Sequence, residues 1–229
     1  MSTPAYNNPV AYDARKAKPI EAYLETLWKP IFADIAKTYI HTSDVVADFG
    51  CGTLAHIALM SHVQKIYAVD ANKIMLEFGL QKLSAHDRAI VTPLCESATH
   101  TSIPSNSCSI IWSVGLTEYT DIDQLFKEMT RVATPMATLL IQFPNKYNIV
   151  HMAIQLAHFL RGTASKKYRS ISEMRRIAHR YGWRVEKAVT TGFYTPLPAI
   201  LIPILDPMWR LFSSFGNNTF LVLQKSTER

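Results

Sequence analysis

The chain has 229 residues, of which 48% are hydrophobic and 18% are charged, and its formal net charge is +6. This composition excludes a disordered chain and suits one large domain or at most two small ones. Three widely spaced cysteines, Cys51, Cys95 and Cys108, exclude a disulfide framework and a zinc knuckle. We therefore expect buried thiols and no metal site.

Apolar runs are too short for a signal peptide or a membrane span, and the nearest one, Leu197–Leu205, contains two prolines. We expect a cytoplasmic protein, and peripheral contact with a membrane stays open. The positive charge favours anionic partners. It does not single out nucleic acid, because the basic residues are spread over the chain, with the densest clusters at Lys166–Arg169 and Arg175–Arg176.

The first 150 residues predict a flexible segment, one helix and then an alternation of strands with helices. Residues 1–18 are rich in Pro, Asn and Tyr, and residues 20–40 carry apolar positions at helical spacing. Apolar strand-like runs follow at 45–49, 64–69, 89–94, 108–113 and 137–142, with helical patterns at about 54–61, 72–84 and 122–132. This alternation predicts a parallel sheet covered by helices on both faces.

After the fifth strand the pattern changes to two helices and two strands. Apolar residues repeat at helical spacing over 149–160, and His151, Gln155 and His158 lie opposite them, as on a solvated polar face. A capping box begins a second helix at Ser170, and strands are predicted at 183–189 and 219–224. The long apolar connection Phe193–Phe215 is typical of a functional cover. We expect a doubly wound, mostly parallel seven-stranded sheet with helical insertions after strands five and six.

The segment VVADFGCGTLAHIAL (45–59) has the form of a nucleotide-binding strand, turn and helix. Gly50 and Gly52 allow a tight bend beside a ligand, and Asp70 ends the next strand, where an acid can accept both hydroxyls of a ribose. A dinucleotide formally fits, because Ala55 satisfies the last position of its fingerprint. Asp48 favours another ligand, since a carboxylate repels a pyrophosphate and attracts an ammonium group. S-adenosylmethionine has that ammonium group and an adenosine end.

Four segments resemble successive motifs of class I S-adenosylmethionine-dependent methyltransferases: Asp48–Thr53, Ala68–Asp70, Cys95–Ala98 and Ile110–Ser113. Within that class, the chain is most similar to the small-molecule group that includes the ubiquinone and menaquinone methyltransferases. The resemblance covers roughly residues 45–145. It implies a Rossmann-like methyltransferase fold, with residues 19–229 as one domain, 45–145 as the cofactor-binding core and 146–215 as substrate-cover insertions.

The resemblance also implies roles for individual residues. Asp48 and the Gly50–Cys51–Gly52 backbone would hold the methionine part of the cofactor, whose product is S-adenosylhomocysteine. Asp70 would bind the ribose. The remaining expected contacts lie around the adenine, the sulfonium and the methionine carboxylate: Ala71, Glu96, Ser97, Ser113, Tyr12 and Arg15.

Leu54 departs from the family pattern, which usually has a third glycine there. We expect its side chain to narrow the approach beside the methionine end, and either to weaken or to reshape cofactor binding. A second departure, Thr134–Ala137, alters only a turn before strand five.

Methyl transfer from a sulfonium is an in-line displacement, and it needs a general base only when the nucleophile arrives protonated. The candidate bases are His56, Glu118, Tyr119 and His151. The apolar insertions predict a small, lipophilic acceptor.

Two alternatives stay open: a nucleic-acid-modifying methyltransferase, and a non-catalytic partner protein that only binds S-adenosylmethionine. Against the first alternative, this chain lacks the Asn/Asp-Pro-Pro-aromatic tetrapeptide that is usual in nucleic-acid-modifying methyltransferases, since residues 113–116 read SVGL. A nicotinamide oxidoreductase is opposed by Asp48.

Overall fold

The computed structural model describes residues 8–15, 18–163, 166–192 and 215–226, which contain one seven-stranded sheet. The strand order is β3-β2-β1-β4-β5-β7-β6, and β7 alone runs in the direction opposite to the other six strands. The doubly wound, mostly parallel sheet expected from the sequence is confirmed. The strands are β1 (Val45–Phe49), β2 (Lys65–Val69), β3 (Val91–Leu94), β4 (Cys108–Val114), β5 (Ala133–Pro144), β6 (Trp183–Thr191) and β7 (Asn218–Lys225).

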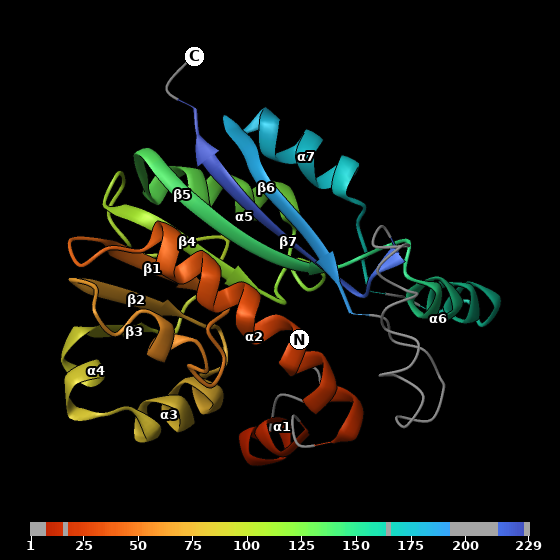
Figure 1. Cartoon of the computed structure of the whole chain (residues 1–229), viewed down its shortest axis with the longest axis horizontal. Helices are drawn as coiled ribbons and strands as arrows, with labels where there is room; N and C mark the ends of the chain where they lie inside the picture. The colour runs from red at the N-terminus through yellow and green to blue at the C-terminus, as the bar shows by residue number, and fades with distance from the viewer. Residues whose placement is uncertain (1–7, 16–17, 164–165, 193–214, 227–229) are drawn as a thin grey trace.

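Helices cover both faces of this sheet (Figure 1). One face packs on α5 and α7, and the other packs on α2 and α3. The helices are α1 (Pro9–Arg15), α2 (Pro19–Tyr39), α3 (Lys73–Lys82), α4 (Ala85–Ile90), α5 (Ile122–Val132), α6 (Ile149–Leu160) and α7 (Ile171–Arg180). Within the described ranges, none of them has the length and apolarity needed to cross a bilayer. The connection after strand six falls largely in 193–214, outside the described residues.

Side chains at the helix starts define several of these boundaries. The side chains of Asn72, Asp121 and Asn148 accept hydrogen bonds from the first amides of α3, α5 and α6. Ser170 and Glu173 form the reciprocal capping box expected at the start of α7. Each cap satisfies amides that have no partner within the helix.

Two expected helices differ in the structure. Residues 54–61 contain only a short 3-10 segment at Ile57–Leu59, because Leu54 has φ +60° and so cannot begin an α-helix. The helix expected over 72–84 ends at Lys82, and Ser84 caps a separate helix, α4. That helix takes the first two residues of the strand expected at 89–94.

The N-terminal segment expected to be flexible contains helix α1 over residues 9–15. Asn8 accepts a hydrogen bond from the amide of Ala11 at 2.9 Å. Asp13 then fastens the helix to the body of the protein, because it accepts a hydrogen bond from Thr53 Oγ1 at 2.9 Å and pairs with Lys82 at 2.6 Å.

The three cysteines are free thiols. Cys51 and Cys108 are buried as expected, but Cys95 is exposed, because it follows β3, the strand at the edge of the sheet.

The long connections after β5 and β6 are held together at one corner. The side-chain amide of Asn145 donates to the Gly216 carbonyl at 2.9 Å, and that of Asn148 donates to the Phe215 carbonyl at 3.1 Å. Both asparagines are buried. The end of β5 and the approach to β7 are therefore fixed to each other through backbone groups.

Gly79 sets how closely α3 approaches the turn after β1. A Cβ atom at this position would lie 2.7 Å from the Thr53 carbonyl carbon and 2.8 Å from Leu54 Cγ. Such distances are shorter than van der Waals contact, so only glycine allows the helix to pack directly on the turn.

We predict that Gly79→Ala lowers the free energy of unfolding by about 1–3 kcal/mol, as overpacking does elsewhere. A decrease would be informative, because helix propensity alone predicts the opposite: alanine stabilises a helix by roughly 1 kcal/mol relative to glycine. Urea unfolding followed by circular dichroism measures the change. Gln81→Ala, at an exposed position of the same helix, is the matched control and is expected to be close to neutral. A stabilised Gly79→Ala protein would contradict the packing described here.

Candidate active site

The turn after β1 is bound tightly to the end of β2. The amides of Gly50 and Cys51 both donate to the Val69 carbonyl, at 2.8 and 3.0 Å. Gly50 has φ +77°, and a Cβ there would lie 3.1–3.3 Å from the Leu116 side chain, so both backbone and space require glycine. The Gly52 amide donates to Asp70 Oδ2 at 2.8 Å.

Asp70 also accepts a hydrogen bond from the Asn72 amide, at 2.8 Å through its other oxygen. Its carboxylate is therefore held at the end of β2. A carboxylate has about four lone-pair directions, so both oxygens can still accept hydroxyl groups from the neighbouring cavity.

Asp48 is 2% exposed, and its carboxylate has no hydrogen-bond partner in the part of the chain that the structure describes. Burial, together with the nearby charge of Asp70, raises the pKa of Asp48 to about 8. A buried acid in this state gains from any cation placed beside it. The pair of carboxylates thus fits a ligand that has an ammonium group near a ribose, and opposes a pyrophosphate.

Leu54 does not narrow the approach to this site, contrary to the sequence expectation. Its side chain is 4% exposed, belongs to the core between the sheet and α2, and packs against Gly79. The positive φ of Leu54 turns the side chain away from the cavity, which Thr53 and Ala55 line instead.

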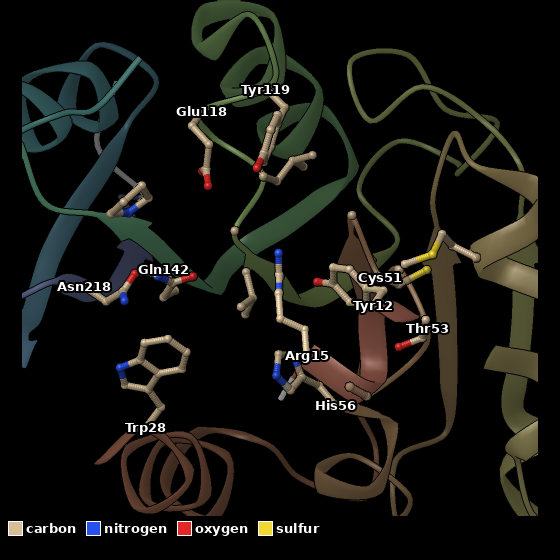
Figure 2. Close-up of a pocket in the computed structure, with 18 of the residues that line it drawn as sticks. Tyr12, Arg15, Trp28, Cys51, Thr53, His56, Glu118, Tyr119, Gln142 and Asn218 are labelled. Atoms are coloured by element: carbon tan, nitrogen blue, oxygen red, sulfur yellow. Dashed lines mark hydrogen bonds between the residues drawn. The ribbon is translucent and has the colours of Figure 1, made fainter. Parts of the chain in front are cut away.

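A cavity of about 1670 Å³ opens at the carboxyl ends of the strands. Sites for one drug-sized ligand measure roughly 300–1,000 Å³, so this cavity has room for two ligands side by side. Figure 2 shows Arg15, Trp28, Glu118 and Tyr119 pointing into it from opposite sides. The predicted residues that line it are Tyr12, Arg15, Asp48, Gly50, Cys51, Gly52, His56, Asp70, Ala71, Glu118, Tyr119 and His151.

Three predicted residues do not line the cavity. Glu96 accepts a hydrogen bond from the Ser102 amide at 2.7 Å, and Ser97 is exposed and bonded to Thr99 at 2.8 Å. Ser113 is fully buried on the α5 side of the sheet, because side chains alternate along a strand and the next residue, Val114, faces the cavity.

His151 is half-buried at the cavity wall and stacks on Tyr168, with ring centroids 4.4 Å apart. It was expected on a solvated face of its helix. Its Nδ1 lies 2.8 Å from the Asn145 carbonyl, which can only accept, so Nδ1 carries the proton. In the neutral ring Nε2 then has a free lone pair. Burial and the Lys166 cation lower the pKa of His151, so the neutral form prevails at pH 7.

Glu118 and Tyr119 follow β4 and face the same space (Figure 2). The Oε2 atom of Glu118 is inaccessible to solvent and has no hydrogen-bond partner among the described residues. Burial raises the pKa of Glu118. The Tyr119 hydroxyl accepts a hydrogen bond from Lys166, whose ammonium also lies 4.7 Å from the ring centroid.

His56 lines the cavity but is poorly suited to act as a base. Trp112 Nε1, which can only donate, lies 3.2 Å from His56 Nδ1. In the neutral ring the basic nitrogen is therefore occupied, and Nε2 carries the proton.

Several cavity residues that no sequence motif indicates come from distant parts of the chain: Trp28 on α2, Gln142 on β5, and Asn217 and Asn218 before and at the start of β7. The Gln142 side chain donates to Asn218. No local spacing links these positions: Gln142 and Asn218 meet because β5 and β7 are paired, and Trp28 reaches the cavity from α2. Asp13, which anchors α1, gave no motif either.

Residues 47–141 match the family model described as "Methyltransferase domain". The chain thus contains a methyltransferase domain over this stretch, and its expected methyl donor is S-adenosylmethionine. The match includes Asp48, the glycine turn and Asp70, the residues whose geometry favours this cofactor. No curated protein sequence gives a significant match to this methyltransferase.

Solved structures share the fold at low identity. A Thermotoga maritima S-adenosylmethionine-dependent methyltransferase is 13% identical, with TM-score 0.67 over 96% of this chain and 97% of that one. A Haloferax volcanii protein solved with the Trm112 methyltransferase activator is 16% identical, with TM-score 0.67 over 94% and 97%. A geranyl diphosphate methyltransferase in complex with S-adenosylmethionine is 13% identical, with TM-score 0.64 over 89% and 86%.

We predict that Asp48→Asn stabilises the ligand-free methyltransferase and weakens its binding of S-adenosylmethionine. Between pH ~4 and ~8 the folded wild type holds a proton on Asp48 that the unfolded chain has lost, so its stability falls as the pH rises. The variant lacks this slope and gains about 1–3 kcal/mol at pH 8. Its affinity for the cofactor falls roughly 100-fold or more, because the buried charge pair is lost.

Urea unfolding across this pH range and calorimetric titration measure the two effects. Glu77→Gln, which removes an exposed acid on α3, serves as the control and should change neither. An Asp48→Asn protein that binds the cofactor as tightly as the wild type would contradict the role of Asp48.

Proposed function

We propose that this methyltransferase transfers the methyl group of S-adenosylmethionine to a small, lipophilic acceptor that carries one nucleophilic oxygen, nitrogen or carbon. The observation that carries the proposal is the cavity, which is large enough for donor and acceptor and has apolar side chains of α2 and α6 in its wall. The cofactor supplies the reactive sulfonium. The protein supplies alignment and exclusion of water, and such alignment lowers barriers by ~7–11 kcal/mol.

The donor half of the cavity has a charged group for each end of the cofactor's amino acid. Asp48 faces its ammonium, and Arg15, which extends from α1 into the cavity, is suited to its carboxylate. The hydrogen bonds of Asp13 to Thr53 and Lys82 hold α1 in place for this contact. Asp70 is suited to the ribose hydroxyls. These assignments are part of the proposal.

The acceptor half lies between α2 and α6. Apolar side chains come from both helices: Leu24, Trp28 and Phe32 from the first, and Val150 and Ile154 from the second. Polar groups also line the cavity, and they include Glu21, Glu25 and Lys29 on α2, Gln142 and Asn218 on the sheet, and Glu118 and His151. An acceptor with an apolar body and one polar end fits such walls, because each exposed apolar surface gains from burial.

His151 is our candidate general base. Its Nε2 lone pair is fixed by the hydrogen bond from Nδ1 to Asn145, and it can receive the proton of an O–H or N–H nucleophile. Glu118 and Tyr119 are candidates for orienting the polar end of the acceptor. With its pKa raised by burial, Glu118 can serve as a hydrogen-bond donor as well as an acceptor.

Methylation of a nucleic acid is the second candidate, since the chain is basic and a structural neighbour was solved with an activator protein. The apolar walls between α2 and α6 favour the lipophilic acceptor over it. The two candidate functions are distinguished by finding which molecule receives the labelled methyl group.

We predict that incubation of the purified protein with methyl-labelled S-adenosylmethionine and a whole-cell extract places the label in the organic-solvent phase. Transfer to a soluble lipophilic acceptor should survive ribonuclease treatment and should change little between low and moderate salt, whereas binding to a nucleic acid depends steeply on salt. The Asp48→Asn protein is the blank. Label that appears only in ribonuclease-sensitive material would overturn the proposal, as would label confined to water-soluble metabolites.

We predict that His151→Gln lowers kcat for a protonated acceptor about 10²–10⁴-fold with little change in cofactor affinity. Wild-type activity should fall at acid pH with an apparent pKa below the usual histidine value, since burial lowers the pKa of His151. This acid limb should be missing in the variant. The pH dependence of kcat at saturating S-adenosylmethionine measures it, because the bound ammonium group keeps Asp48 ionised and removes its own titration from the profile.

His158→Gln is the matched control, because His158 lies on the same helix, bonds to Thr163 and does not line the cavity. Loss of activity that is equal in the two variants, or an acid limb that persists without His151, would exclude His151 as the base.

A further inference from the structure

Helix α6 is amphipathic, but the face that it exposes to solvent is the apolar one. Successive residues turn by about 100°, so Val150, His151 and Ile154, which line the cavity, lie on one side. The opposite side, an arc of roughly 100°, is apolar and exposed: Ile149 (68%), Met152 (52%), Leu156 (58%), Phe159 (80%) and Leu160 (74%). We call these five residues the α6 outer face.

The α6 outer face is unusual for a protein surface. The described residues of this helix include none that is buried, and none of its twelve residues is acidic, lysine or arginine. In Figure 1, α6 projects away from the sheet, beyond the ends of β5 and β7. Contiguous exposed apolar surface of this kind marks an interaction site rather than ordinary exposure.

Basic residues precede and follow helix α6 in the sequence. Residues 145–172 contain five basic residues and no acidic one: Lys146, Arg161, Lys166, Lys167 and Arg169. Arg161 and Lys167 are exposed, and their side chains form no ion pair with any other described residue. An apolar helix face with cations beside it matches a surface that is apolar inside and anionic at its boundary.

We propose that the α6 outer face docks onto an anionic lipid bilayer, with its apolar side chains in the acyl boundary and Arg161 and Lys167 among the headgroups. A second copy of this chain is a poorer occupant, because the exposed, unpaired Arg161 and Lys167 of one copy would meet the same two cations of the other. The proposal does not depend on the identity of the acceptor. It does place the cavity side of the same helix next to the bilayer.

The test is cosedimentation of the full chain with vesicles of phosphatidylglycerol and phosphatidylcholine in equal parts, and with vesicles of phosphatidylcholine alone. We expect binding to the anionic vesicles that weakens with salt. The double variant Phe159→Ser/Leu160→Ser should reduce the partition coefficient about tenfold or more. Both side chains are largely exposed, so the fold should be unaffected.

The double variant Arg161→Gln/Lys167→Gln should reduce binding to anionic vesicles about tenfold or more. Matched controls are Met136→Ser, at an exposed apolar residue in the first part of β5, and Lys127→Gln/Arg184→Gln, which removes two exposed cations elsewhere. Neither control should change binding. Retained far-ultraviolet circular dichroism and cofactor affinity show that each variant is folded.

Several results would overturn the proposal: no binding to anionic vesicles, equal binding to phosphatidylcholine alone, or binding that either double variant leaves unchanged. Self-association in sedimentation velocity that Phe159→Ser/Leu160→Ser abolishes, without vesicle binding, would assign the α6 outer face to a second copy instead.

Discussion

Two carboxylates with opposite surroundings organise this site. Asp70 accepts hydrogen bonds from the amides of Gly52 and Asn72, so its charge is stabilised and the turn is fixed to β2. Asp48, on the adjacent strand, is buried without such bonds, and the charge of Asp70 raises its pKa further. The folded protein thus carries an electrostatic cost that a cationic ligand relieves. A cationic group beside Asp48 is therefore favoured over an anionic one.

Other contacts hold the turn after β1, helix α3 and helix α1 in place around these two carboxylates. Gly50 and Gly79 let the turn and α3 approach without side chains between them. Asp13 then holds α1 over the turn through Thr53 and Lys82. The same polar contacts bring Arg15 to the cavity, so a short N-terminal helix forms part of the cavity wall.

Much of the fold could be predicted from the sequence, because apolar runs and caps are local signals. The seven strands and the capping box at Ser170 are of this kind. The site was predictable only where spacing encodes it, as for Asp48, the glycine turn and Asp70. The direction of the Leu54 side chain depends on a backbone angle, and the contacts of Trp28 and Asn218 depend on tertiary packing. The sequence pattern identified the two faces of α6 but assigned them to the wrong surroundings, because periodicity does not tell which face meets the protein.

The asparagine corner has an evolutionary consequence. Asn145 and Asn148 hold the backbone at Gly216 and Phe215, so the segments that diverge after β5 and β6 return to a common junction. Since that junction is built on main-chain carbonyls, it tolerates almost any side chains beyond it. New acceptor ranges can therefore arise by exchanging these segments as a cassette, while the methyl-donor machinery is inherited unchanged.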